Sequence, residues 1–183
     1  GKSHYLTAIT KVDGKIVEII DVEKVLAEIV PYETAVTEGV VDLDIMARVS
    51  QSGLKVLAVD DSAIARSQVK ETLTSLGLEV IQANDGLEAF NILRKMAQDG
   101  PINSQLLMLI TDAEMPAMDG YMLTTEIRSH PDLKDMYIVL HTSLSGSFNE
   151  AMVEKVGCNA FLSKFQPDGL AAAVEVRAKQ LFG

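Results

Sequence analysis

Short apolar runs alternate with longer amphipathic segments from Leu54 to the end of the chain. The apolar runs are rich in aliphatic and β-branched residues and are bounded by turn signals, which is typical of strands buried on both faces. They read LKVLAVD at 54–60, LEVIQA at 78–83, LLMLIT at 106–111, MYIVLHT at 136–142 and AFLS at 160–163. Five strand–helix units in series predict an α/β fold, a doubly wound parallel sheet with helices on both faces.

The intervening helices carry start and stop signals. Asp85 with Glu88, and Ser147 with Glu150, have the spacing of a capping box, in which the first side chain bonds to the backbone at the start of a helix. Glycines stand where helices should end, since a glycine closes a helix in the left-handed conformation without a steric penalty. These glycines are Gly77, Gly100 and Gly157.

Residues 1–30 follow a different pattern. Two strand-like runs flank Asp13-Gly14, a strong hairpin signal because both turn positions favour a positive φ. A short helix is expected from Asp21 until Pro31. A hairpin with one helix buries too little apolar surface to be stable alone, so it is either an appendage or the tail of a domain cut off upstream. Residues 31–53 show no sustained period and predict a linker with a single helical turn within 43–49.

Composition narrows the function. The chain has 16 basic and 26 acidic residues and a net charge of −10, which argues against a nucleic-acid surface and suits acidic clusters that hold a cation. A single cysteine, Cys158, excludes an internal disulfide and favours a reducing compartment. No run approaches the ~20 apolar residues of a membrane span, and the start lacks a secretory signal. We therefore expect a cytoplasmic protein without membrane insertion.

Polar side chains stand where the predicted strands end. Asp60 and Asp61 close the first strand, Asp112 the third, Thr142 the fourth and Lys164 the fifth. The carboxyl ends of parallel strands meet at one edge of a sheet. If the chain reverses across the sheet after the second strand, the first and third strands become neighbours and a ligand crevice opens there. These five residues are therefore expected to converge.

Three neighbouring carboxylates repel one another, and a divalent cation resolves that conflict. Mg²⁺ prefers oxygen ligands, so Asp61 and Asp112 are predicted as direct ligands and Asp60 as a direct or water-mediated one. The backbone carbonyl of Glu114 is a further candidate. With Lys164 and a hydroxyl from Thr142, such a cation would form a phosphoryl-binding site in which Asp112 becomes an aspartyl phosphate. The chain has no glycine-rich phosphate cradle, so the phosphoryl group is expected to arrive on another protein or a small donor.

The motifs AVDDS at 58–62, DAEMPAMDG at 112–120 and HTS at 141–143, with the late Lys164, resemble a response-regulator receiver domain over residues 54–183. That resemblance implies a flavodoxin-like sheet of order 2-1-3-4-5 and a phosphoacceptor rather than an enzyme. It assigns phosphate acceptance from a histidine kinase to Asp112 and Mg²⁺ binding to Asp60 and Asp61. It also implies that Thr142 and Lys164 read out the phosphate and that Phe161 is a switch aromatic.

The segment YLTAITKVDGKIVEIIDVEKVLAEI is similar to the last hairpin and helix of a CheW-like coupling domain. A coupling domain followed by a receiver is the layout of the CheV family, here truncated at its N-terminus. The resemblance implies a chemotaxis adaptor with a histidine kinase as phosphodonor and, in the full-length parent, chemoreceptors as partners of the coupling domain. Residues 1–30 are then expected to pack on the receiver or to form a homodimer.

One departure and two alternatives accompany this interpretation. Receivers usually follow the lysine with proline, whereas Phe165 follows Lys164, and a cis bond before a non-proline residue costs about 3 kcal/mol. An interaction-only pseudo-receiver is one alternative, which the intact acidic set opposes. An Asp-nucleophile phosphatase is the other, but such sites place a second aspartate where Glu114 stands. Asp119 is expected to cap the next helix, with Gly120 allowing a close approach.

Overall fold

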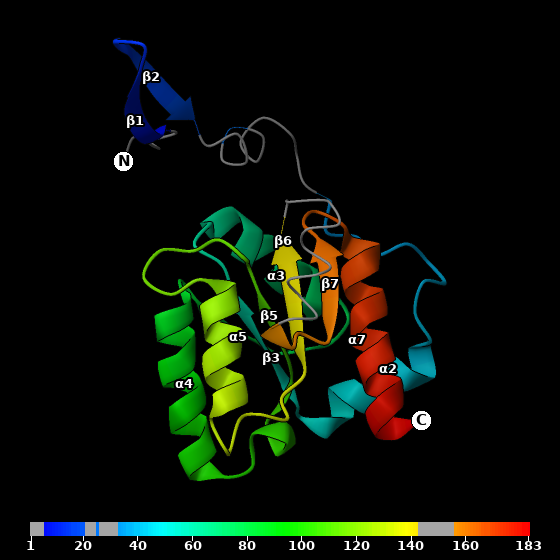
Figure 1. The fold of residues 1–183 in the computed structure, drawn as a ribbon. Coiled ribbons are helices and arrows are strands. Elements are labelled where there is room, and N and C mark those ends of the chain that lie inside the picture. Colours follow the sequence, from blue (N-terminus) through cyan, green and yellow to red (C-terminus); the bar gives the residue numbers. More distant parts are fainter. Residues whose placement is uncertain (1–5, 21–24, 26–32, 143–155) are drawn as a thin grey trace. The chain divides into compact units, whose positions relative to one another are not determined.

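The computed structural model describes residues 6–20, 25, 33–142 and 156–183 (Figure 1). The chain divides into two compact units, residues 1–32 and 33–183.

The first unit contains an antiparallel hairpin of β1 (Leu6–Val12) and β2 (Lys15–Ile20). Asp13 and Gly14 form the turn with φ angles of 51° and 76°, as the hairpin signal predicts. Ile9, Ile16 and other apolar side chains of the hairpin are exposed. The helix predicted after Asp21 lies almost wholly outside the described residues.

The second unit is built on a five-stranded parallel sheet, which confirms the predicted fold and strand order. Its order is β4-β3-β5-β6-β7, so the chain reverses direction across the sheet after its second strand. The strands are β3 (Lys55–Val59), β4 (Val80–Ala83), β5 (Leu106–Thr111), β6 (Ile138–Thr142) and β7 (Ala160–Ser163). Every residue of the central strand β5 is buried, because helices cover both of its faces.

Helices cover the sheet in two layers (Figure 1). One apolar core joins the sheet to α3 (Ala63–Ser75) and α7 (Pro167–Phe182), and the other joins it to α4 (Gly86–Asp99) and α5 (Gly120–Ser129). A short 3₁₀ helix, η1 (Ile102–Ser104), precedes β5. Within the parts of the chain that are described, no helix is both long and apolar enough to cross a lipid bilayer.

Local signals set the helix boundaries. Asp85 accepts a hydrogen bond from the Glu88 amide at 2.8 Å, as its capping position predicts, while the Glu88 carboxylate accepts from the amide of Asn84. Gly77 closes the turn after α3 with a φ of 82°. The second predicted capping box, Ser147 with Glu150, lies outside the described residues.

The segment before β3 is more ordered than the predicted linker with one helical turn. It contains α2 (Leu43–Ser52), a ten-residue helix capped by Asp42 and ended by Gly53 with a φ of 72°. Met46 and Val49 are buried in the core that α3 and α7 share. These two residues are three positions apart, so their side chains lie on the same face of the helix, and that face packs against the core.

His141 on β6 is a buried ionisable side chain on the α3–α7 side of the sheet, 5 % exposed. Burial, and to a lesser degree the charge of Lys164, lowers its pKa from 6.5 to about 3. The folded protein therefore keeps this imidazole neutral in a pH range where the unfolded chain binds a proton. Protonation consequently favours the unfolded state between these two pKa values.

We predict that a His141→Leu variant loses less stability in acid than the wild type. Between about pH 7.5 and about pH 5, the wild type should lose about 2 kcal/mol more of its free energy of unfolding than the variant does. Urea unfolding at both pH values measures the difference. His130→Leu, at a partly exposed histidine, is the control and should follow the wild type. Equal acid losses in wild type and His141→Leu would contradict the prediction.

Candidate functional site

The strand order brings three charged side chains together. Val59 and Thr111 are partners in the parallel register of β3 and β5, so the next residues, Asp60 and Asp112, lie side by side just past the carboxyl ends of these two strands. The Asp112 amide donates to the carbonyl of Val59 at 2.8 Å, which holds the two strand ends together. Lys164 follows β7 and reaches this point from across β6.

Lys164 bridges the two aspartates. Its Nζ lies 2.9 Å from Asp60 Oδ2 and 3.1 Å from Asp112 Oδ1, and its side chain is only 3 % exposed. Ion pairs at the surface contribute little because water screens them, whereas a buried group of charges needs its partners in place. The lysine is therefore an integral part of this site and offsets the cost of burying two carboxylates.

One cation does not fully compensate two buried anions. Burial raises the pKa of Asp112 from 3.8 to about 7, and Asp60 adds to this shift while Lys164 opposes it. Burial likewise raises the pKa of Asp60, again against the effect of Lys164. Near neutral pH the site therefore gains from a further proton or a further cation.

A divalent cation fits the donor set. Carboxylate oxygens of Asp60, Asp61 and Asp112 all lie within 4.8 Å of one another, and the exposed Asp61 gives the group access to solvent. Hard oxygen donors with this net negative charge suit Mg²⁺, and a bound cation would also remove the desolvation penalty of the two buried carboxylates. Glu114 is exposed in the loop two residues past Asp112, and metal binding through its carbonyl stays a prediction.

Residues at the start of α3 fix Asp60, and these contacts were not predicted from the sequence. The Ser62 amide donates to Asp60 Oδ1 at 2.8 Å, and the Arg66 guanidinium donates to the Asp60 carbonyl. Ser62 is also the N-cap of α3. A serine directly after the two acids and an arginine one helical turn later were the available signals.

A tight loop orients Asp112. Its Oδ1 accepts a hydrogen bond from the Ala113 amide at 2.8 Å, and the Gly120 amide donates to the Ala113 carbonyl. Asp119 caps α5 by accepting from the Met122 amide, as predicted. A Cβ at Gly120 would lie 2.0 Å from the Asp112 carbonyl oxygen, so only glycine permits this approach.

The remaining predicted residues lie on β6, β7 and the loop after β7. Thr142 is buried at the end of β6, and its carbonyl accepts from the Lys164 amide at 3.1 Å. Phe161 is half-buried on β7 opposite Leu140, so its switch role stays a prediction. Phe165 joins Lys164 through a trans peptide bond and has a φ of 62°.

A family model for the response regulator receiver domain matches residues 56–175. The matched region extends from β3 into α7 and includes all the residues of the acidic site. The "Chemotaxis protein CheY4" of Vibrio cholerae has a similar solved structure, 31 % identical with a TM-score of 0.58, covering 67 % of this chain and 97 % of that one.

Curated chemotaxis proteins are also similar in sequence. A "Chemotaxis protein CheY homolog" of Campylobacter jejuni is 36 % identical over 124 residues, 67 % of this chain and 90 % of that protein. "Chemotaxis protein CheV1" of Helicobacter pylori is 28 % identical over 163 residues, 89 % of this chain and 49 % of that protein. The chain thus spans about half the length of CheV1.

We predict that Gly120→Ala displaces Asp112 and lowers the free energy of unfolding by about 2 kcal/mol, since the added Cβ meets backbone that cannot move aside. Urea unfolding measures the loss. Gly169→Ala is the matched control: its added Cβ would have no neighbour closer than 3.7 Å, and alanine favours the helix. Equal stability of the two variants would contradict this account of the loop.

We also predict that Asp112→Asn stabilises the cation-free fold at alkaline pH. Burial raises the pKa of Asp112 from 3.8 to about 7. The stability that this group contributes is therefore fully present below the lower value and is lost as pH rises from the lower to the upper value, because the unfolded chain has then released the proton that the folded protein still holds. At about pH 8 the variant should exceed the wild type by about 2 kcal/mol, and the gap should narrow toward about pH 5.

The measurement is urea unfolding in a chelator, repeated with Mg²⁺, which should stabilise the wild type but not Asp112→Asn. Asp119→Asn, which changes a helix cap in the same loop, is the control and should keep the Mg²⁺ response. An Asp112→Asn variant that is less stable than the wild type at alkaline pH would contradict the prediction.

Proposed function

Since the chain belongs to the response regulator receiver family, we propose that it is a phosphorylatable chemotaxis adaptor in which Asp112 accepts a phosphoryl group from a histidine kinase. The observation that carries this proposal is the buried arrangement of Asp60 and Asp112 around Lys164 Nζ. Together with the exposed Asp61, this arrangement offers a nucleophile, the buried ammonium group of Lys164 and a set of hard oxygen ligands at the carboxyl end of the sheet.

In the proposed transfer, a carboxylate oxygen of Asp112 attacks the phosphorus atom of the donor. The new O–P bond forms as the P–N bond to the donor imidazole breaks, and the imidazole leaves with the bond's electron pair and takes up a proton. Asp112 must be ionised to attack, so Lys164, which lowers the pKa of this group, favours the reactive form. The Ala113 amide donates a hydrogen bond to Asp112 Oδ1 and so holds the carboxylate in a fixed orientation for this attack.

Asp60, Asp61 and Asp112, with the Glu114 carbonyl, would hold Mg²⁺. When bound, the ion would neutralise the phosphoryl oxygens and bring the donor to the acceptor. Lys164 would then bind a phosphoryl oxygen, and the Thr142 hydroxyl would donate a hydrogen bond to another. We propose that Thr142 and Phe161 pass this change to the surface of the receiver.

The adaptor role rests on the part of the chain outside the receiver match. The similarity to CheV1 extends over 163 residues, more than the receiver alone. We propose that residues 1–30 are the end of a CheW-like coupling domain, that residues 31–53 connect it to the receiver at 54–183, and that the full-length parent is CheV-type. Its coupling domain would contact chemoreceptors and the chemotaxis kinase in the cytoplasm, and residues 1–30 would pack on the receiver or form a homodimer.

Phosphorylation with acetyl phosphate and Mg²⁺, followed by mass spectrometry of the intact protein, tests the proposal. The wild type should gain one phosphoryl group, Asp112→Asn should gain none, and a chelator should abolish uptake. Asp119→Asn is the control for a changed aspartate in the same loop and should behave as the wild type does.

Persistent phosphorylation of Asp112→Asn would refute Asp112 as the acceptor. Failure of the wild type to take up phosphate or to bind Mg²⁺ would instead favour a pseudo-receiver. Repeated turnover of p-nitrophenyl phosphate would favour a phosphatase. Transfer from an autophosphorylated chemotaxis histidine kinase to the wild type, but not to Asp112→Asn, would support the kinase as donor.

A further inference from the structure

A segment without helix or strand, residues 33–42, runs from the start of the second unit to the cap of α2, and we call it the strap. Hydrogen bonds from its backbone attach it to two helices. The Thr37 amide donates to Asp168 Oδ1 at 2.7 Å, and the Asp42 amide donates to Glu175 Oε1 at 3.0 Å. The Glu33 carbonyl accepts from Gln68 Nε2 of α3 at 3.1 Å. The strap thus connects the first turn of α7 with the side of α3.

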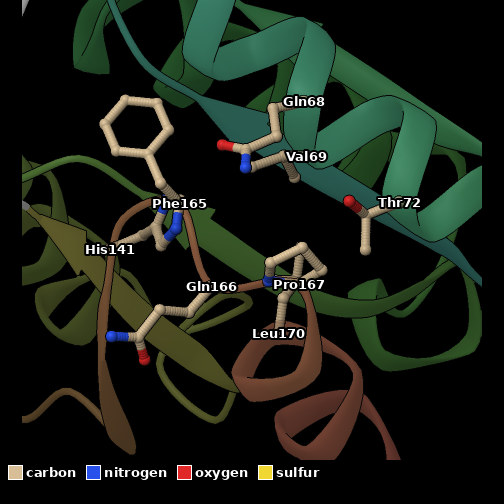
Figure 2. A pocket seen from close by; sticks show the side chains of 8 residues that line it. All are labelled: Gln68, Val69, Thr72, His141, Phe165, Gln166, Pro167 and Leu170. Carbon is tan, nitrogen blue, oxygen red and sulfur yellow. The ribbon is translucent and has the colours of Figure 1, made fainter. Parts of the chain in front are cut away.

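Two of these anchors adjoin the loop that carries Lys164. Asp168 is the second residue of α7, and only Phe165 and Gln166 separate this helix from Lys164. Gln68 is buried and lines a small cavity together with His141 and Phe165, the residues next to Thr142 and Lys164 (Figure 2). The third anchor, Glu175, lies about two turns farther along α7. The strap therefore has two attachments beside the loop that follows Lys164 and one farther along α7.

The loop between Lys164 and α7 contains a strained residue and borders a small cavity. Phe165 has a φ of 62°, a left-handed conformation that is unfavourable for a residue with a bulky side chain. The cavity lies beside it, and across the cavity stands Thr72, a buried threonine whose hydroxyl has no hydrogen-bond partner among the described residues (Figure 2). The strained backbone and the adjacent cavity make the position of this loop sensitive to its outer attachments.

We propose that Asp168 is a positioning residue for the phosphorylation site. By binding the strap at Thr37, it fixes the start of α7 and the loop residues 165–166, and thereby the position of Lys164 between Asp60 and Asp112. This inference rests on the proposed function of Asp112. It extends that function by making the strap, the segment that leads back toward residues 1–32, sensitive to phosphorylation.

The coupling follows from the shared lysine. Lys164 Nζ divides its contacts between Asp60 and Asp112, and a phosphoryl group on Asp112 would present new anionic oxygens to it. Asp168 follows Lys164 by only four residues, so a shift of Lys164 would move the start of α7 as well. Coupling of this kind is reciprocal: if phosphorylation changes the strap's hold on Asp168, loss of that hold changes phosphorylation.

A matched pair of variants tests the positioning role. Asp168→Ala and Glu175→Ala each remove a carboxylate of α7 that accepts from a strap amide, but only the first lies beside the Lys164 loop. The rate of phosphorylation by acetyl phosphate with saturating Mg²⁺ should fall about three- to tenfold in Asp168→Ala and should stay at the wild-type value in Glu175→Ala. Asp168→Asn keeps an acceptor oxygen and should restore the rate.

Hydrogen exchange in the unaltered protein gives a second measurement that no folding defect can affect. Phosphorylation should change the exchange rate of the Thr37 amide by about threefold or more, with a smaller change at the Asp42 amide. Asp112→Asn, treated identically, should show no change at either amide.

The outcomes separate this inference from the function beneath it. If the wild type takes up no phosphoryl group, both fail. If Asp112 is phosphorylated but the Thr37 amide exchanges as before, and Asp168→Ala reacts at the rate of Glu175→Ala, only the role of Asp168 is refuted. An equal loss of rate in both α7 variants would also refute it, because the strap would then act only through general stability.

Discussion

The contact of Lys164 with Asp60 and Asp112 is the interaction on which the rest of the site depends. Two carboxylates are removed from water at the ends of neighbouring strands, and one buried ammonium group lies between them. Desolvation outweighs this attraction, which is why the pKa of Asp112 stays raised to about 7. The site is therefore held together by its lysine and is left favourable to an additional cation.

The fold supplies the constraints that keep this arrangement in place. Helices on both faces bury β5 completely, so Asp112 leaves the core at a fixed position. The backbone of Gly120 lies so close to the Asp112 carbonyl that a side chain at position 120 would not fit. Ser62 and Arg66 hold Asp60 through hydrogen bonds. Each of these contacts involves a backbone group, which limits how far the two aspartates can move. Preorganisation of this kind would favour the proposed phosphoryl transfer to Asp112, since little reorganisation is needed when charge develops.

The strap and α2 distinguish this chain from a receiver domain alone. They precede the residues that the receiver family model matches, yet Met46 and Val49 belong to the same apolar core as α3 and α7. Hydrogen bonds to Asp168 and Glu175 extend this attachment along α7. Residues 33–53 therefore belong to the same compact unit as the residues of the acidic site, and the chain continues from them to residues 1–32.

Periodicity in the sequence determined the element types, and local chemistry determined many of their boundaries. The alternation of buried runs and amphipathic segments predicted the parallel sheet, Asp13-Gly14 the hairpin turn, and Asp85 and Asp119 the helix caps. These features involve neighbours a few residues apart, so their physical causes are contained in short stretches of chain. Polar residues at strand ends also predicted that the site residues would converge, because parallel strands share one edge.

Tertiary structure decided what depends on residues far apart in the chain. The lysine bridge joins residues that follow β3, β5 and β7, and its two distances depend on the strand order and on the burial that follows from it. The packing of α2 against α7 was missed because its apolar face is short and its partners come more than a hundred residues later. The contact of Thr37 with Asp168 was invisible for the same reason, since a backbone amide carries no sequence signal. Short-range preferences thus specified the pieces, whereas burial and long-range pairing decided which charges face one another.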